Sequence, residues 1–252
     1  NTLRRDVKAY LFSSKERDIY EKKYFIHKSK IEVVGVPRHT KSWIDFIRLE
    51  MLTQTQRSDP LDKSILIISR PGNTNYFSLE RKKKSLEDIK KLVWFELNKN
   101  IVVKLHPKEG KEGIYEEVFG IENYGEKWTY SNSHPFVLGA NIPFAISFYS
   151  GVVIDMLALG VPTIEYLDLR GIPEFDNDES LHDKMGHPVF SYRYLNLVLG
   201  ASDYTQMKDH ALKIMKKRKT ILSRLHKKYS ILFPRIEGIN HKISQDILNT
   251  IH

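Results

Sequence analysis

Apolar residues gather in short runs in the middle of the chain, and amphipathic stretches separate these runs. The runs are rich in Ile and Val, which is typical of strands buried on both faces. They are 64–69, 101–105, 144–148 and 161–166. The intervening helices are expected at 79–97, 136–140 and 152–159. Strand and helix thus alternate, which predicts an α/β fold with a Rossmann-like parallel sheet and helices on both faces.

The two ends of the chain show helical patterns instead, with only one further short strand expected at 31–38. These helices are expected at 4–25, 41–54, 204–232 and 239–251. The polar stretch 54–62 contains Pro60 and is the best candidate for a linker. The expected division is an N-terminal part with its linker at 1–57, a Rossmann-like domain at 58–235 and a C-terminal helix at 236–252. We expect this last helix to pack back on the N-terminal part.

Polar residues and glycines follow the first three predicted strands where these strands end. They are Arg70, Gly72 and Asn73 after the first strand, Lys104, His106 and Pro107 at the end of the second, and Tyr149, Ser150 and Gly151 after the third. Ligands of open parallel sheets bind outside the carboxyl ends of the strands. We therefore expect these residues to share one edge of the sheet and to form a binding site there.

The turn Tyr149-Ser150-Gly151 stands between a predicted strand and a predicted helix. Free backbone N–H groups at the start of a helix suit a phosphate, and glycine lets a ligand approach the backbone closely. The alternative is that Ser150 only caps the helix. The two roles are compatible with each other.

His106 lies where a strand enters a loop, and Pro107 restricts the backbone beside it. A histidine there can donate a hydrogen bond to a phosphate or act as a general acid. Its alternative role is that of an ordinary polar loop residue. Lys104 alternates with His106 along the strand, and the sequence leaves open which way it faces.

Glu165 and Tyr166 end the fourth predicted strand. Glu165 is a candidate for binding ribose hydroxyls, and Tyr166 is a candidate for the same nucleotide site. Pairing of Glu165 with a nearby Lys or Arg is an equally good interpretation.

Composition narrows the chemistry of the site. The chain has 252 residues and no Cys, so disulfides, a thiolate nucleophile and a Cys-based metal site are excluded. We predict no metal site, because no metal-ligand spacing such as HExxH occurs. The phosphate-binding motifs GxxxxGK[ST] and GxGxxG are also missing from the sequence.

The net charge of +9 favours anionic partners such as nucleotides, phospholipid surfaces or nucleic acid. Two runs of cations, 81–84 and 216–219, lie on predicted helices. They are either solvated faces or contacts to anionic lipid headgroups. No apolar run is long enough to span a bilayer and no signal peptide is recognisable, so we expect a cytoplasmic protein, peripheral on the inner face of the membrane.

With these residues in place, the chain resembles a known group of enzymes. The segment VVKLHP, followed about forty residues later by FAISFYSGVVIDMLALGVPTIEY, is similar to the C-terminal, donor-binding domain of bacterial GT-B glycosyltransferases that use cytidine-linked donors. The group includes capsule sialyltransferases, Kdo transferases of lipopolysaccharide and CDP-glycerol glycerophosphotransferases. His106-Pro107 matches its His-Pro motif and Ser150 its serine motif, and the resemblance implies that both contact the donor phosphate.

The resemblance covers about residues 28–170 and implies a glycosyltransferase that needs no cofactor. The expected partners are a nucleotide-sugar donor, a glycan or lipid-linked acceptor and an anionic membrane surface. Residues 31–38 resemble the segment that closes the N-terminal domain of these enzymes. This resemblance implies that residues 1–57 are the remnant of an acceptor domain and its linker. The sequence departs from the group in two respects: it lacks the acidic-acidic-Gly motif that supplies a general base, and Gly151 replaces a second serine.

The leading hypothesis is transfer of an acidic sugar, of the Kdo or sialic acid type, from a CMP-linked donor to a bacterial surface polysaccharide or lipopolysaccharide. A CDP-glycerol-type glycerophosphotransferase and a UDP-sugar transferase or epimerase are alternatives within the same architecture. A non-catalytic basic module that binds nucleic acid is the alternative of another class. We do not expect nucleic acid as a partner, because the charge runs lack interleaved exposed aromatics.

Overall fold

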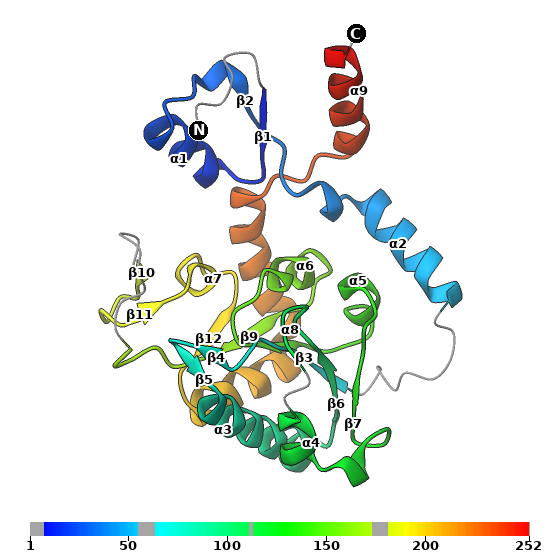
Figure 1. Ribbon diagram of the computed structural model, residues 1–252, viewed down its shortest axis with the longest axis vertical. Coiled ribbons are helices and arrows are strands. Elements are labelled where there is room, and N and C mark those ends of the chain that lie inside the picture. The colour runs from blue at the N-terminus through cyan, green and yellow to red at the C-terminus, as the bar shows by residue number, and fades with distance from the viewer. Residues whose placement is uncertain (1–7, 55–63, 111–112, 173–180, 252) are drawn as a thin grey trace. The chain divides into compact units, whose positions relative to one another are not determined.

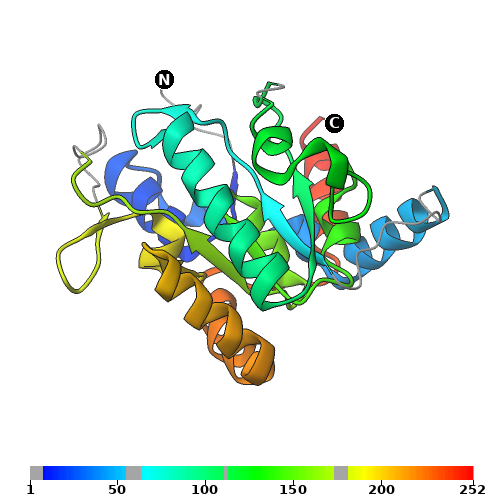
Figure 2. The ribbon, with the colours of Figure 1, turned by 90° about the horizontal axis from the view of Figure 1, so that it is seen from below.

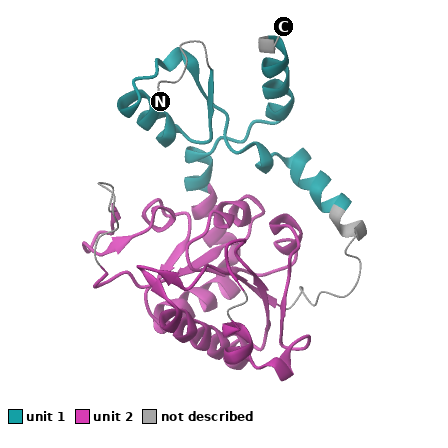
Figure 3. Cartoon of the chain, in the orientation of Figure 1, with its two compact units in different colours: residues 1–54, 227–252 teal, residues 55–226 magenta. Residues whose placement is uncertain are grey.

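The computed structural model describes residues 8–54, 64–110, 113–172 and 181–251 (Figure 1, Figure 2). Its contacts divide the chain into two compact units, coloured separately in Figure 3: unit 1 is 1–54 with 227–252, and unit 2 is 55–226. The linker predicted at 54–62 lies almost wholly outside the described residues. None of the described helices is both long and apolar enough to cross a membrane.

Unit 2 is built on a six-stranded parallel sheet (Figure 1). Its strands, in chain order, are β3 (Ser64–Ile68), β6 (Asn100–Lys104), β7 (Trp128–Tyr130), β8 (Ala145–Ser147), β9 (Thr163–Tyr166) and β12 (Leu199–Ala201). Their order across the sheet is β12-β9-β8-β3-β6-β7, and all the pairings are parallel. The predicted α/β class with a parallel sheet is confirmed.

Helices pack on both faces of this sheet, because alternate strand residues point to opposite sides. On one face, Ile65, Ile67 and Val103 pack in a core with residues of α3 (Leu79–Lys90), α4 (Ile114–Phe119) and the first turns of α8 (Tyr204–Leu232). On the other face, Leu66 and Val102 pack with residues of α5 (Pro135–Leu138) and α6 (Val152–Ala158). Figure 2 shows α3 along one side of the sheet.

Several elements of unit 2 differ from the sequence predictions. The helix expected over 79–97 is α-helical only as far as Lys90, where α3 ends. It continues directly as a π-helical segment, η4 (Lys91–Glu96). Strands β7 and β12 were not predicted, because each has only three residues. Such short segments become strands through their pairing with β6 and β9, which the local sequence pattern does not reveal. The stretch 168–190, for which no element is predicted above, holds a small antiparallel pair, β10 (Leu181–His182) with β11 (Pro188–Val189). Its residues 173–180 lie outside the described residues.

Shorter elements complete unit 2 around the sheet. They are the hairpin β4 (Asn73–Thr74) with β5 (Phe77–Ser78), the 3-10 turn η5 (Ile121–Asn123) and the helix α7 (Ser191–Tyr194). The β4–β5 hairpin follows β3, so it stands among the loops at the carboxyl edge of the sheet.

In unit 1, the single helix predicted over 4–25 is wrong. Residues Ala9–Leu11 form the strand β1, and helix α1 (Ser14–Lys23) begins only after Ser13. Ser13 and Glu16 form a capping box, in which each side chain bonds the backbone N–H of the other residue. Strand β1 pairs in parallel with β2 (Ile31–Val33), so the strand predicted over 31–38 ends earlier than expected.

The remaining elements of unit 1 are η1 (Lys28–Lys30), η2 (Pro37–His39), α2 (Lys41–Gln54) and α9 (Ile239–Ile251). The C-terminal residues contact the N-terminal ones: Lys8 pairs with Asp246 at 3.1 Å, and Lys242 pairs with Glu32. Gly35 has a φ of 73° and leaves no room for a side chain, because a Cβ there would lie 1.7 Å from the Pro234 carbonyl oxygen.

Candidate functional site

Three loops leave the sheet side by side at its carboxyl edge. They follow β8, β3 and β6, which are neighbours in the sheet. Ile68 at the end of β3 is in register with Lys104 of β6 and with Ser147 of β8, so the three loops begin at the same level. The candidate residues after the first three predicted strands therefore come from adjacent loops.

Arg70 connects the loop after β3 with the loop after β8. Its Nη1 donates a hydrogen bond to the carbonyl oxygen of Tyr149 at 2.8 Å. The guanidinium carbon lies 5.1 Å from the centroid of the Tyr149 ring and 5.2 Å from that of Tyr76, both within cation–π range. Arg70 thus places a permanent positive charge between the two loops.

The loop after β8 holds Tyr149 in an unusual conformation. Its φ is 81°, the left-handed region that non-glycine residues seldom adopt. The Tyr149 ring stacks on Phe190, with centroids 3.8 Å apart and an interplanar angle of 7°. This stack and the bond from Arg70 compensate for the backbone strain and fix the direction of the turn.

Ser150 and Gly151 follow at the entrance to α6. Ser150 Oγ accepts a hydrogen bond from the Val152 N–H at 3.3 Å, within the turn that leads into the helix, whose N-cap position is occupied by Gly151. Its own O–H remains a donor. Gly151 is exposed, and a Cβ there would meet only the Tyr192 hydroxyl, at 3.5 Å. The backbone at Gly151 is therefore open to a ligand.

His106 is half-buried at the end of β6, and the exposed Pro107 follows it. Its Nδ1 accepts a hydrogen bond from the Lys108 N–H at 3.1 Å. In the neutral ring the proton is then on Nε2, which is the nitrogen free to donate. Burial lowers the pKa of His106, and the nearby Arg70 charge lowers it further. His106 is therefore a neutral hydrogen-bond donor near pH 7, beside a fixed cation.

The His106 loop is held by Glu109, a residue that the sequence analysis did not identify. Glu109 Oε2 accepts from the His106 backbone N–H at 3.1 Å, and the Glu109 N–H donates to the His106 carbonyl at 2.8 Å. Its Oε1 accepts from the hydroxyls of Ser69 at 2.8 Å and Tyr115 at 3.3 Å. The carboxylate thus ties the ends of two neighbouring strands together.

Lys82 completes this buried cluster. Its side chain is fully buried and pairs with the equally buried carboxylate of Glu109. The Lys82 ammonium also lies 5.0 Å from the centroid of the Tyr115 ring. A buried ion pair needs such additional partners, because both ions lose their hydration. Lys82 and Glu109 hold the His106 loop from inside the fold and do not reach its surface.

The other candidates at this edge have different surroundings. Gly72 is buried, and a Cβ there would lie 3.0 Å from the Lys82 side chain. Asn73 is exposed in the β4–β5 hairpin. Lys104 Nζ donates to the Ser133 carbonyl oxygen at 3.0 Å, and burial lowers the pKa of its ammonium.

Glu165 is turned into the protein. Its side chain is 1% exposed, and its Oε1 accepts from Arg193 Nε at 3.2 Å. Burial raises the pKa of this carboxyl to about 7, although the Arg193 charge acts in the opposite direction. The structure thus shows the ion pair that the sequence analysis gave as the alternative to a ribose contact.

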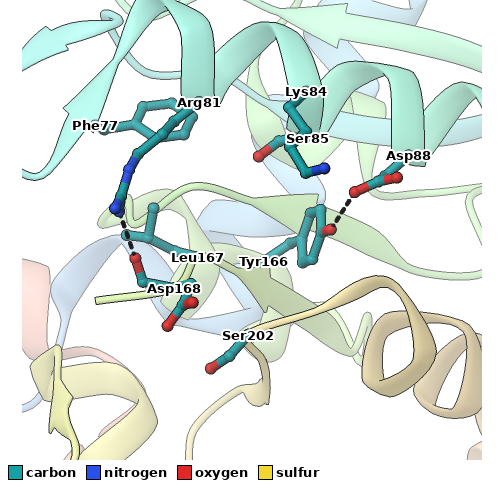
Figure 4. A pocket seen from close by; sticks show the side chains of 9 residues that line it. All are labelled: Phe77, Arg81, Lys84, Ser85, Asp88, Tyr166, Leu167, Asp168 and Ser202. Atoms are coloured by element: carbon teal, nitrogen blue, oxygen red, sulfur yellow. Dashed lines mark hydrogen bonds between the residues drawn. The ribbon is translucent and has the colours of Figure 1, made fainter. Parts of the chain in front are cut away.

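Tyr166 points to the opposite face of β9. Its hydroxyl donates to Asp88 of α3 at 2.6 Å. The ring lines a cavity of about 230 Å³ that Arg81 and Asp168 also border (Figure 4). The Arg81 guanidinium donates to the Asp168 carbonyl oxygen at 3.1 Å across this cavity. Tyr166 is therefore directed toward α3 and away from the loop of Tyr149, which Arg70 contacts.

The arrangement at the carboxyl edge suits an anion. Arg70 supplies a charge, His106 Nε2 and the Ser150 hydroxyl supply donors, and Gly151 supplies an open backbone. Charge-assisted hydrogen bonds of this kind are how proteins hold phosphate groups.

The fold is shared with solved enzymes of nucleotide-linked sugar and polymer chemistry. The wall teichoic acid polymerase TagF matches with a TM-score of 0.60 and 14% sequence identity, over 97% of this chain and 59% of its own. A UDP-GlcNAc 2-epimerase from Neisseria meningitidis matches at 0.55 and 14%, over 96% and 61%. A putative UDP-N-acetylglucosamine 2-epimerase from Listeria monocytogenes matches at 0.57 and 13%, over 92% and 55%.

The chain thus spans less than two thirds of the length of each of these enzymes. Likeness at 13 to 14% identity shows the fold alone. No protein-family model and no curated protein sequence matches the chain. Its function is therefore argued from the geometry of the site.

Proposed function

We propose that this chain binds the donor nucleotide of a GT-B-type transferase, with Arg70, His106 and Ser150 around the donor phosphate. The observation that carries the proposal is their convergence from three adjacent strand ends at one sheet edge. The likeness to TagF and to the epimerases supports it, because these are enzymes of the same fold whose names refer to nucleotide-linked substrates or polymer synthesis.

The donor we propose is a CMP-linked acidic sugar of the Kdo or sialic acid type. In the transfer, the bond between the sugar's anomeric carbon and the phosphate oxygen breaks, and CMP leaves with the electron pair. The Nε2–H of His106 donates to the departing phosphate, and the Arg70 charge stabilises it. These two side chains stabilise the negative charge that develops in the transition state, and this accelerates the reaction. The scheme uses no metal-binding residue.

The acceptor in this proposal is a hydroxyl of a bacterial surface polysaccharide or lipopolysaccharide. The acceptor hydroxyl attacks the anomeric carbon and must lose a proton to a base. Glu109 and Glu165 are both buried in ion pairs and are therefore not suited to this step. We therefore assign this chain the donor half of the reaction.

Glycerophosphate transfer from a CDP-glycerol-type donor is the second candidate. It is favoured by the likeness to TagF, one structure of which was solved after a soak with CDPG. A UDP-sugar transferase or epimerase is the third, favoured by the likeness to two epimerases. All three place a nucleotide phosphate at the same strand ends and differ in the base and in the number of phosphates.

Calorimetric titration with CMP, CDP and UDP separates these candidates. We expect cytidine nucleotides to bind at least about tenfold more tightly than UDP, with a difference of about 1.4 kcal/mol. CMP binding that equals or exceeds CDP binding supports the CMP-linked donor, and stronger CDP binding supports the second candidate. His106→Ala should weaken binding, whereas His241→Ala, at an exposed position of α9, should not. Absence of any nucleotide binding to the wild-type protein would contradict the proposal.

A further inference from the structure

The positive charge of the chain is concentrated on one helix. Helix α8 contains nine Lys and Arg residues and a single acidic residue, Asp209, so it carries +8 of the chain's +9. The other 31 cationic and 30 acidic residues of the chain nearly cancel. A charge spread over the whole surface would serve solubility, whereas a charge confined to one helix indicates an anionic partner.

A groove opens on this helix at the position where it bends. Lys217 has φ and ψ of −133° and 36°, so the helical geometry is interrupted there. The groove has a volume of about 470 Å³. Its lining combines the cations Lys213, Lys216, Lys217 and Arg224 with a single carboxylate, that of Asp209, and with the apolar side chains of Leu212 and Ile221.

The four cations that line the groove have no carboxylate within ion-pair distance among the described residues. Other cations of the helix are already engaged: Lys208 pairs with Glu96 at 2.5 Å, and Arg218 donates to the Gly160 carbonyl oxygen at 3.0 Å. With four cations against the one carboxylate of Asp209, the groove keeps a net positive charge that is available to a partner.

We propose that the groove of α8 and the cations around it bind the anionic phospholipid headgroups of a membrane surface. A phosphate headgroup satisfies the cations, and the apolar side chains accommodate the glycerol and the first methylenes of the lipid. Met215, which precedes Lys216 in the same helix, is 45% exposed and adds apolar surface to α8. Figure 2 shows α8, in orange, at the outside of unit 2.

Nucleic acid fits the same charge less well. Proteins that bind single strands present exposed aromatic rings on which bases stack. The aromatic residues of α8 are Tyr204, which is half-buried, and Tyr229, which is buried against His39. The groove therefore offers a lipid phosphate its charges and an apolar lining, but offers a base no ring. This inference does not depend on the identity of the donor nucleotide.

Co-sedimentation with lipid vesicles tests the proposal on the full chain. We expect strong binding to vesicles that contain about one third phosphatidylglycerol and little binding to vesicles of pure phosphatidylcholine. Binding to the anionic vesicles should fall steeply between about 50 and about 300 mM salt, because salt screens charges over roughly 10 Å in this range. The variant with Lys213, Lys216, Lys217 and Arg224 all changed to Gln should bind at least about tenfold more weakly.

The matched control changes Lys22, Lys23, Lys28 and Lys30, on the other unit, to Gln and removes the same charge. It should keep most of the binding. Equal loss in both variants would show a non-specific charge effect and overturn the proposal. Binding of the wild type to a DNA oligonucleotide in preference to the anionic vesicles would also overturn it, as would equal binding to neutral and anionic vesicles. The last two outcomes need no variant, so the test holds even if the quadruple change unfolds the protein.

Discussion

A buried glutamate lies beneath each side of the proposed phosphate site, and the two differ in how well they are partnered. Glu109, behind His106, uses both oxygens: it accepts from Lys82, Ser69, Tyr115 and the His106 backbone. Glu165 lies opposite Ser147, at the foot of the Tyr149 loop, and only its Oε1 is bonded. Its Oε2 is buried without a partner among the described residues.

This difference in hydrogen bonding indicates which of the two loops is the more rigid. A fully bonded carboxylate gives the His106 loop one arrangement, because any shift breaks several buried bonds at once. The Tyr149 loop is held by the stack on Phe190, the bond from Arg70 to its backbone and a 3.5 Å contact between the hydroxyls of Tyr149 and Ser191. These contacts lie nearer the surface, and the carboxylate at the foot of this loop is incompletely satisfied. We infer that both loops are held before the donor binds, and that the His106 loop is the more rigid of the two.

The largest effect is expected from breaking the Glu109 cluster. Glu109→Ala leaves Lys82 buried without its carboxylate, which should reduce the free energy of unfolding by about 3–5 kcal/mol. Urea denaturation measures this loss. The control Glu117→Ala breaks an exposed pair with Lys83 and should change little. Similar stability of the two variants would show that the Glu109 cluster does not hold the loop.

The pH dependence of stability should distinguish the second glutamate. The pKa of Glu165 is raised to about 7 in the fold, from an ordinary value near 4.5. Between these two values the folded chain keeps a proton that the unfolded chain has lost, so the contribution of Glu165 to stability falls as pH rises from about 4.5 to 7. Glu165→Gln should flatten this part of the profile in thermal unfolding from pH 4 to 8. An unchanged slope would contradict the raised pKa.

A smaller effect is expected at the aromatic stack. Phe190→Ala removes the ring beneath Tyr149 and should cost about 1 kcal/mol of pair energy beyond the loss of apolar burial. Nucleotide binding should weaken as well, because the loop that carries Ser150 loses its support. Tyr194→Ala, which removes another partly exposed ring, is the control for binding. Unchanged nucleotide affinity in Phe190→Ala would show that the loop keeps its form without the stack.

The smallest effect is a change in the titration of His106. The Arg70 charge lowers the pKa of His106, so Arg70→Met should raise it. Imidazole resonances in a two-dimensional NMR titration report this shift directly. Arg81→Met, which removes a charge beside the separate cavity of Figure 4, should leave His106 unchanged. A His106 pKa that does not move in Arg70→Met would mean that the two side chains do not share one site.

The sequence could predict the sheet and its functional edge because both follow from local pattern. Runs such as Ile65 to Ile68 mark buried strands, and the rule of strand ends then selects His106 and Ser150. It could not find Lys82, which appeared in a charged run. Only its spacing to Leu86 and Ile89, four and seven residues on, places it on the buried stripe of α3.

The direction in which a strand side chain points could not be predicted from the sequence either. Glu165 and Tyr166 are adjacent in a strand and so face opposite sides, and the tertiary structure decides which side is which. The helix expected from residue 4 failed for a local reason, since the capping box at Ser13 and Glu16 starts the helix later. The Ser-x-x-Glu pattern of this capping box is visible in the sequence, but the helical spacing of the apolar residues before it favours an earlier start.

Comparison of CMP with cytidine tests the central claim most directly, because the two ligands differ only in the phosphate. Calorimetry should give the wild type at least about a tenfold preference for CMP, and the preference should largely disappear in Arg70→Met and in His106→Ala. Both variants should bind cytidine itself as the wild type does. Equal affinity of the wild type for CMP and cytidine, or a preference for CMP that survives both substitutions, would contradict a phosphate site at this edge of the sheet.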